Sequence, residues 1–233
     1  MNRAIRILCN YTKGGAGKTT LAVHVAGLLM EETLGRVLLV DCDPRPDSYM
    51  FFSGQAPDPN QLSLTLEDNL VLRWNPPQPK GTRFQPITQK DYERYEYVVI
   101  DTDSPPEDAL TILDETCPDI FLVPIAESQS HSIGNLSPFL SALERGVVFQ
   151  RNAETRYNYN PVVKIVPLGL SFDEIEDELD VDRFNDITIQ VCTPMANLAS
   201  EMRKSLKEKV LIWNYQNLED TKDYFATLIE DLI

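Results

Sequence analysis

The stretch TKGGAGKTT, residues 12–20, decides the fold of this chain. An apolar run precedes it at residues 4–9, and a second apolar run follows it at residues 21–30. This order predicts a buried strand, a glycine-rich loop and a helix. Glycines at three of four consecutive positions remove the side chains that would keep the backbone from wrapping around an anion. The N–H groups of such a loop, at the positive end of a helix dipole, can bind phosphate.

The polar residues of this stretch suit a nucleoside triphosphate. Lys18 places a positive charge near the β- and γ-phosphates, and the Thr19 hydroxyl is a suitable ligand for Mg²⁺. The stretch therefore has the form of a P-loop, GxxxxGK[ST], with Thr12 in the place of the first glycine. A glycine-rich turn without a ligand is the alternative, and the match of seven positions between a strand and a helix favours the P-loop. The candidate nucleotide-binding residues are Lys13, Gly14, Gly15, Ala16, Gly17, Lys18, Thr19 and Thr20.

Two later apolar runs end in carboxylates. Residues 37–41 end in Asp41, with Asp43 two positions later, and residues 95–101 end in Asp101. Fully apolar runs are typical of parallel strands that are covered on both faces. Since functional groups of an open parallel sheet lie at the carboxyl ends of its strands, we expect these carboxylates near the phosphate loop.

The chain resembles the ParA/MinD family of ATPases in three stretches. Residues 13–20, KGGAGKTT, resemble the deviant Walker A box of that family, in which a second lysine precedes the usual one. Residues 41–44, DCDP, resemble its DxDP box, with Arg45 where glutamine often follows. Residues 102–106, TDSPP, resemble its DTPP switch, with two extra residues before the prolines.

The resemblance implies roles for individual residues. Lys13 would reach across a nucleotide-sandwich dimer to the ATP of the partner, although it is otherwise explained as one more phosphate-facing or solvated lysine. Asp43 would orient the attacking water, because phosphoryl transfer needs positioning and charge compensation. The implied catalytic residues are Lys13, Lys18 and Asp43, the implied Mg²⁺ ligands are Thr19, Asp43 and Asp101, and the implied adenine-site residues are Pro194 and Met195.

Composition narrows the class of protein. A chain of 233 residues, 42% of them hydrophobic, is predicted to form one domain over residues 1–233. The net charge of −15 repels nucleic acid and anionic membranes at long range, so any DNA contact needs a local basic patch. The four cysteines form no CxxC pair, which favours buried thiols over disulfides or a metal site. No apolar run suits a signal peptide or a membrane span, so we expect a cytoplasmic protein.

Residues 197–210 supply the candidate basic patch. Apolar side chains recur there every four positions, while Arg203, Lys204 and Lys207 fall on the opposite face, with Lys209 nearby. The pattern predicts an amphipathic helix, and these four cations are the candidate DNA-binding residues. An ordinary solvated helix face explains the same pattern equally well.

Other segments carry no assigned chemistry. Residues 218–233 predict an amphipathic helix with an acidic polar face, the wrong sign for a membrane, so we expect it to pack in the core. Residues 172–182 hold seven carboxylates without EF-hand spacing, and predict a solvated acidic surface or else a face for a basic partner. Residues 47–90 are punctuated by prolines and predict one strand, at 70–74. The two histidines stand alone in the sequence, which favours structural or surface roles.

The predicted fold is α/β, a doubly wound and mainly parallel sheet of about seven strands flanked by helices. This is the arrangement of a SIMIBI-like P-loop NTPase, with ATP and Mg²⁺ at the carboxyl edge of the sheet. The predicted strands cover residues 4–9, 37–41, 70–74, 95–101, 120–124, 162–167 and 188–192.

The resemblance implies a partition or positioning ATPase, of the short kind without an N-terminal helix-turn-helix because the P-loop begins near residue 12. ATP would drive a homodimer that binds DNA without sequence preference and so associates with the nucleoid. A ParB-like adaptor or cargo protein would stimulate slow ATP hydrolysis and release the dimer. One alternative is a MinD-like regulatory ATPase that acts on a membrane or a protein scaffold. The acidic C-terminal helix argues against the membrane. Another is a P-loop ATP-dependent ligase that acts on small molecules.

Overall fold

The computed structural model describes residues 3–11, 15–66, 69–76, 89–102, 116–127, 133–152 and 159–230. Lys13 and Gly14 of the P-loop lie outside the described residues. The two extra residues of the DTPP-like stretch, Asp103 and Ser104, also lie outside them.

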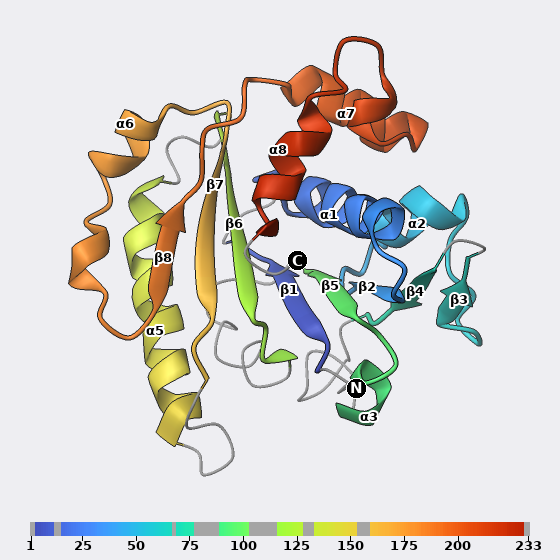
Figure 1. Cartoon of the computed structure of the whole chain (residues 1–233), viewed down its shortest axis with the longest axis horizontal. Helices are drawn as coiled ribbons and strands as arrows, with labels where there is room; N and C mark the ends of the chain where they lie inside the picture. Colours follow the sequence, from blue (N-terminus) through green and yellow to red (C-terminus); the bar gives the residue numbers. More distant parts are fainter. Residues whose placement is uncertain are drawn as a thin grey trace.

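One eight-stranded sheet organises the chain, in the order β3-β4-β2-β5-β1-β6-β7-β8 (Figure 1). All neighbouring strands run parallel except β3, which is antiparallel to β4. The doubly wound, mainly parallel sheet is therefore confirmed. The strands are β1 (Ile5–Cys9), β2 (Val37–Asp41), β3 (Ser63–Thr65), β4 (Leu70–Trp74), β5 (Tyr97–Asp101), β6 (Ile120–Ala126), β7 (Val162–Leu168) and β8 (Thr188–Val191).

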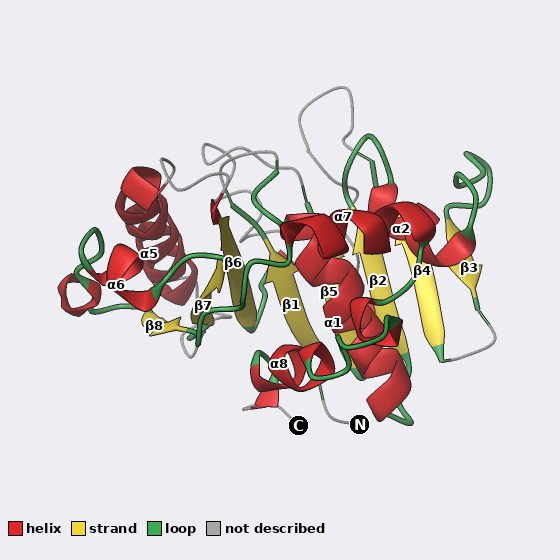
Figure 2. Cartoon of the chain, turned by 90° about the horizontal axis from the view of Figure 1, so that it is seen from above, coloured by secondary structure: helices red, strands yellow, loops and turns green. Residues whose placement is uncertain are grey.

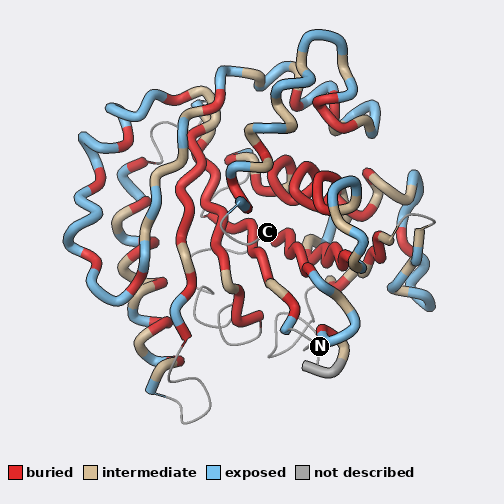
Figure 3. The backbone as a smooth tube through the Cα atoms, in the orientation of Figure 1, coloured by how far each residue is buried: buried red, intermediate tan, exposed pale blue. Residues whose placement is uncertain are grey.

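The expected number of about seven strands is one too few. All seven predicted strands are present, and the additional strand is β3, at the edge of the sheet. Its three residues are exposed or half-buried, so they carry no apolar run for a sequence pattern to detect. The central strands behave as their sequences predict, since every residue of β2 and β5 is buried (Figure 3).

Helices cover both faces of the sheet (Figure 2). The apolar residues of one face pack with α1, α2, α7 and α8, and those of the other face pack with α5 and α6. A separate hydrophobic core therefore lies on each face of the sheet. The helices are α1 (Lys18–Glu32), α2 (Asp47–Ser53), α3 (Gln89–Tyr92), α5 (Leu136–Asn152), α6 (Phe172–Glu176), α7 (Ala199–Glu208) and α8 (Thr221–Thr227), with short 3₁₀ turns η3 (Val181–Arg183) and η4 (Ile212–Asn214).

The C-terminal helix packs in the core, as expected for an amphipathic helix whose acidic polar face does not suit a membrane. Phe225 of α8 and the following Leu228 are fully buried. Lys222 forms ion pairs with Glu31, at 2.9 Å, and with Glu32 at the end of α1. Within the part of the chain that the structure describes, no helix is both long and apolar enough to cross a bilayer.

His24 fastens α1 to this C-terminal region, which agrees with the structural role expected of it. Its ring is fully buried and stacks on Phe225, with 4.9 Å between the ring centroids. Nδ1 donates to the carbonyl of Thr20 at 2.7 Å, and Nε2 accepts the backbone N–H of Ile212 at 3.2 Å. The ring is therefore neutral, and burial lowers the pKa of His24 to about 4.

Candidate functional site

The phosphate loop requires glycine at its last turn. Gly17 precedes the first residue of α1 and has a φ of 106°, in the left-handed region that favours glycine. A Cβ atom at this position would lie 2.6 Å from the Cδ1 atom of Leu168, at the end of β7. The loop is thus packed closely against β7, and the N-terminus of α1 opens at the carboxyl edge of the sheet.

Two buried carboxylates lie side by side next to this helix. Asp41 and Asp101 occupy paired positions on β2 and β5, and both side chains are buried. Asp41 accepts hydrogen bonds from Ser48 Oγ at 2.7 Å and from the N–H of Tyr49 at 2.9 Å. These contacts join the end of β2 to the start of α2.

The electrostatics of this pair favour a cation. Burial raises the pKa of Asp101, and the neighbouring charge of Asp41 raises it further. Hydrogen bonds from the Thr19 and Ser48 hydroxyls, together with the charge of Lys18, act in the opposite direction on the same pKa. A divalent cation beside Thr19 would relieve the repulsion between the two carboxylates.

The loop after β2 is held in place by hydrogen bonds. The indole N–H of Trp74 donates to the carbonyl of Asp43 at 3.0 Å, which ties the loop to β4. The carboxylate of Asp43 accepts the N–H of Arg45 at 2.8 Å, and the N–H of Asp43 donates to Asp41 at 3.0 Å. Asp43 is therefore fixed close to the buried pair while its side chain stays only partly buried.

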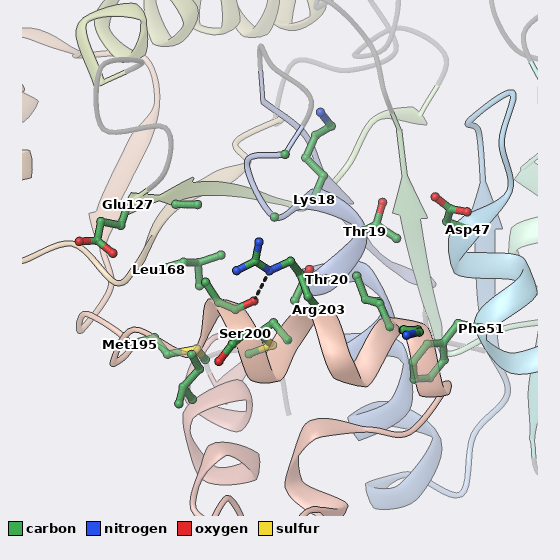
Figure 4. A pocket seen from close by; sticks show the side chains of 18 of the residues that line it. Lys18, Thr19, Thr20, Asp47, Phe51, Glu127, Leu168, Met195, Ser200 and Arg203 are labelled. Atoms are coloured by element: carbon green, nitrogen blue, oxygen red, sulfur yellow. Dashed lines mark hydrogen bonds between the residues drawn. The ribbon is translucent and has the colours of Figure 1, made fainter.

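A cavity of about 1510 Å³ opens over the start of α1 (Figure 4). This volume exceeds the roughly 300–1,000 Å³ of common small-molecule sites, so a nucleotide fits with room to spare. At its centre lie Gly15, Gly17, Lys18, Thr19 and Thr20. Figure 4 shows Glu127, Leu168 and Met195 at one end and Asp47 and Phe51 at the other. Asp43, Arg45, Met50 and Asn197 also line the cavity. From α7 and its end come Ser200, Met202, Arg203, Leu206, Lys207 and Lys209.

The cavity brings together most of the residues that the sequence predicts for a nucleotide site. Three predicted nucleotide or metal residues that the structure describes are not part of its lining. Ala16 is a fully buried residue of the loop, and Asp101 is buried beside Thr19. Pro194 is half-buried next to Met195, which alone of this predicted pair faces the cavity.

Three of the four candidate DNA-binding cations line the cavity, and the fourth does not. Arg203, Lys207 and Lys209 line the cavity. Lys204 instead lies over the ring of Tyr215, 4.5 Å from its centroid. The helix itself matches its prediction, since Met202 and Ser205 are buried and the cations are exposed.

Sequence reasoning missed part of the site. It assigned no chemistry to residues 47–90, but α2 borders the cavity through Asp47, Met50 and Phe51. The position of Asp41 at the carboxyl end of a buried parallel strand predicted that it lies near the phosphate loop, but no binding role was assigned to it. Short helices such as α2, with seven residues, give no comparable periodic pattern.

The donor set fits Mg²⁺. The described residues contain no group of three or more His, Cys, Asp or Glu side chains that could hold a metal by themselves. Mg²⁺ is commonly bound by one or two carboxylates together with waters and the phosphates of a substrate. The hydroxyl of Thr19 and the two carboxylates of Asp43 and Asp101 meet that description.

Comparison with known proteins defines the family. Residues 7–231 match the CobQ/CobB/MinD/ParA nucleotide binding domain, and the chain belongs to this family. The resemblance drawn from the P-loop is thereby confirmed. No curated protein matched the sequence.

Solved structures share the fold at low sequence identity. An ATP complex of McdA from Cyanothece is 14% identical with a TM-score of 0.65, and the match covers 100% of this chain and 97% of that chain. A ParA family ATPase from Chlorobium tepidum TLS is 18% identical with a TM-score of 0.61, covering 97% and 100%. The cell division ATPase MinD of Pyrococcus furiosus is 14% identical with a TM-score of 0.60, covering 99% and 100%. At these identities the structures establish the α/β fold of ParA and MinD proteins.

Proposed function

We propose that residues 1–233 form a single ATPase domain that positions or segregates cargo. The observation that carries this proposal is the cavity that unites Lys18 and Thr19 of the P-loop with Asp43 of the next loop. The family membership supports nucleotide binding. The Cyanothece McdA structure, which shares the fold, is an ATP complex.

ATP lies lengthwise in the cavity in this proposal. The N–H groups at the start of α1 and the Lys18 ammonium bind its phosphates. The adenine lies at the apolar end, against Leu168 and Met195. Thr19, Asp43 and Asp101 hold Mg²⁺, with Asp41 beside them, and the bound ion offsets the negative charge of the phosphates. Asp43 orients the attacking water from its fixed place on the loop after β2.

ATP binding drives a homodimer in which Lys13 reaches the ATP of the partner. A ParB-like adaptor or cargo protein then stimulates hydrolysis and releases the dimer. The prediction is that Asp43→Ala blocks turnover but keeps ATP binding, because Thr19 and Asp101 still hold Mg²⁺, so that a dimer accumulates with ATP. Light scattering should show twice the mass of the single chain.

The matched control for this measurement is Asp223→Ala, on the exposed face of α8. This variant should hydrolyse ATP as the wild-type chain does and accumulate no dimer. An Asp43→Ala chain that binds ATP and stays monomeric would reject the dimer cycle.

The dimer binds DNA without sequence preference through the cations of α7 from both chains. Arg203 and Lys207 lie beside the nucleotide cavity, so ATP and DNA binding are close in space. Arg203→Glu together with Lys207→Glu is expected to abolish DNA binding at low salt. For the wild-type dimer, the log of the DNA-binding constant should fall by about 0.9 per unit of log[salt] for each phosphate contact.

Arg36→Glu with Arg94→Glu makes the same change of charge at exposed positions before β2 and β5, at the opposite edge of the sheet. That control should bind DNA normally, and both variants should dimerise with ATP. The DNA step fails if the wild-type ATP dimer binds no DNA at low salt, or if both double variants bind it equally.

A further inference from the structure

Arg45 lines the cavity from the loop that joins β2 to α2, and its side chain contacts Asp47, which lies at the end of the cavity away from Met195 (Figure 4). Its neighbours in the cavity lining are Asp43 and Asp47. Lys18 and Thr19 lie at the centre of the same cavity, and Leu168 and Met195 lie beyond them (Figure 4). A nucleotide with its base against Leu168 and Met195 and its phosphates over α1 therefore points its last phosphate toward the loop that carries Arg45.

The side chain of Arg45 is held on one edge only. Its Nε atom lies 3.0 Å from Oδ2 of Asp47, and its Nη2 atom lies 3.0 Å from the same oxygen. The backbone is fixed as well, because the N–H of Arg45 donates to Asp43 and the N–H of Asp47 donates to the carbonyl of Arg45 at 2.8 Å. The guanidinium thus has a defined direction without being buried.

The remaining edge of the guanidinium is available to an anion. Guanidinium carries five N–H donors in a planar fork, and Asp47 accepts on the Nε side. Among the described residues no acceptor is within hydrogen-bond distance of Nη1, and the side chain is 82% exposed. The ion pair with Asp47 contributes little to folding, because solvent screens exposed charges. The guanidinium of arginine matches phosphate better than the ammonium of lysine does, because its planar fork of N–H groups binds two oxygens at once.

We propose that Arg45 binds the terminal phosphate of the nucleoside triphosphate and makes this cavity prefer ATP to ADP. Asp47 is the positioning residue that keeps the guanidinium on the phosphate side of the loop. The assignment rests on the proposed binding of ATP at the P-loop and adds the residue that reads the third phosphate. It gives α2 and the loop before it a direct part in distinguishing the two nucleotides.

The test is the affinity for two ligands, measured by isothermal titration with Mg²⁺. AMPPNP represents the triphosphate without hydrolysis, and ADP lacks the terminal phosphate. Arg45→Gln is expected to weaken AMPPNP binding by about tenfold or more, the loss for a hydrogen bond to a charged group, and to leave ADP binding nearly unchanged. Arg45→Lys keeps the charge without the fork, so its preference for AMPPNP should lie between those of wild type and Arg45→Gln. The control is Arg94→Gln, which changes the charge equally at an exposed position before β5 and should bind both ligands as wild type does.

Three results would overturn the assignment. Equal weakening of AMPPNP and ADP by Arg45→Gln would show that the side chain supports the loop and not the phosphate. A wild-type preference that survives Arg45→Gln would refute Arg45 as its source and leave the proposed function standing. A folded wild-type chain that binds neither nucleotide would refute the proposed function and this assignment together.

Discussion

Lys18→Ala is expected to lower ATP turnover roughly 100- to 1,000-fold, the range found when one preorganised group that stabilises charge is removed from an active site. Lys18 is only 7% exposed and lies at the centre of the cavity, next to Thr19 (Figure 4). Its ammonium supplies a full positive charge where the N–H groups of the loop supply only partial ones. Steady-state release of phosphate measures the effect.

Lys222→Ala is the matched control for Lys18. Lys222 contacts the opposite end of the same helix, through Glu31 and Glu32, so its loss removes partly exposed ion pairs far from the cavity. The cost of such pairs is small, about 0–1 kcal/mol each, and turnover should stay at the wild-type value. Equal turnover in the Lys18→Ala and wild-type chains would show that the cavity is not where ATP is hydrolysed.

Acid is expected to destabilise the chain through His24. The pKa of His24 is about 4 in the folded state against 6.5 for an exposed histidine, because burial disfavours the charged ring. Above pH 6.5 the ring is neutral in both states and no stability is lost. As the pH falls from 6.5 toward 4, only the unfolded chain takes up the proton, so the free energy of unfolding falls by roughly 3 kcal/mol from this residue.

The difference between wild type and His24→Leu in urea unfolding from pH 7 to pH 4 measures this loss, because the raised pKa values of the buried Asp41–Asp101 pair affect both chains alike. The variant should be less stable at pH 7 by about 1–3 kcal/mol, because the N–H of Ile212 loses its acceptor. Its free energy of unfolding should then fall less steeply with acid than that of the wild type. Identical slopes for His24→Leu and wild type would contradict the account of His24.

The sheet was predictable because its strands are apolar runs with clear ends. The run that ends at Asp41 and the run that ends at Asp101 read as buried parallel strands, and the structure pairs those two residues. The edge strand β3 was not predictable, since two of its three residues are exposed and the third is only half-buried. An apolar sequence pattern reveals a strand only where its side chains are buried, and β3 is largely exposed.

The site was predictable where chemistry follows a fixed spacing, as in the P-loop. It was not predictable where the chain folds back on itself. Arg203 and Lys207 read as an isolated basic face, but α7 packs beside α1, and this packing turns them toward the same cavity as Lys18. Asp47 was overlooked for the same reason, because only the tertiary fold brings α2 to the mouth of the cavity.

The central claim is that ATP binds over the start of α1, and titration of the wild-type chain with ATP and Mg²⁺ tests it most directly. The account predicts saturable binding of one ATP per chain that weakens sharply without Mg²⁺ and is lost in Lys18→Ala. Absence of binding by the folded wild-type chain, or binding of equal strength by Lys18→Ala, would contradict it.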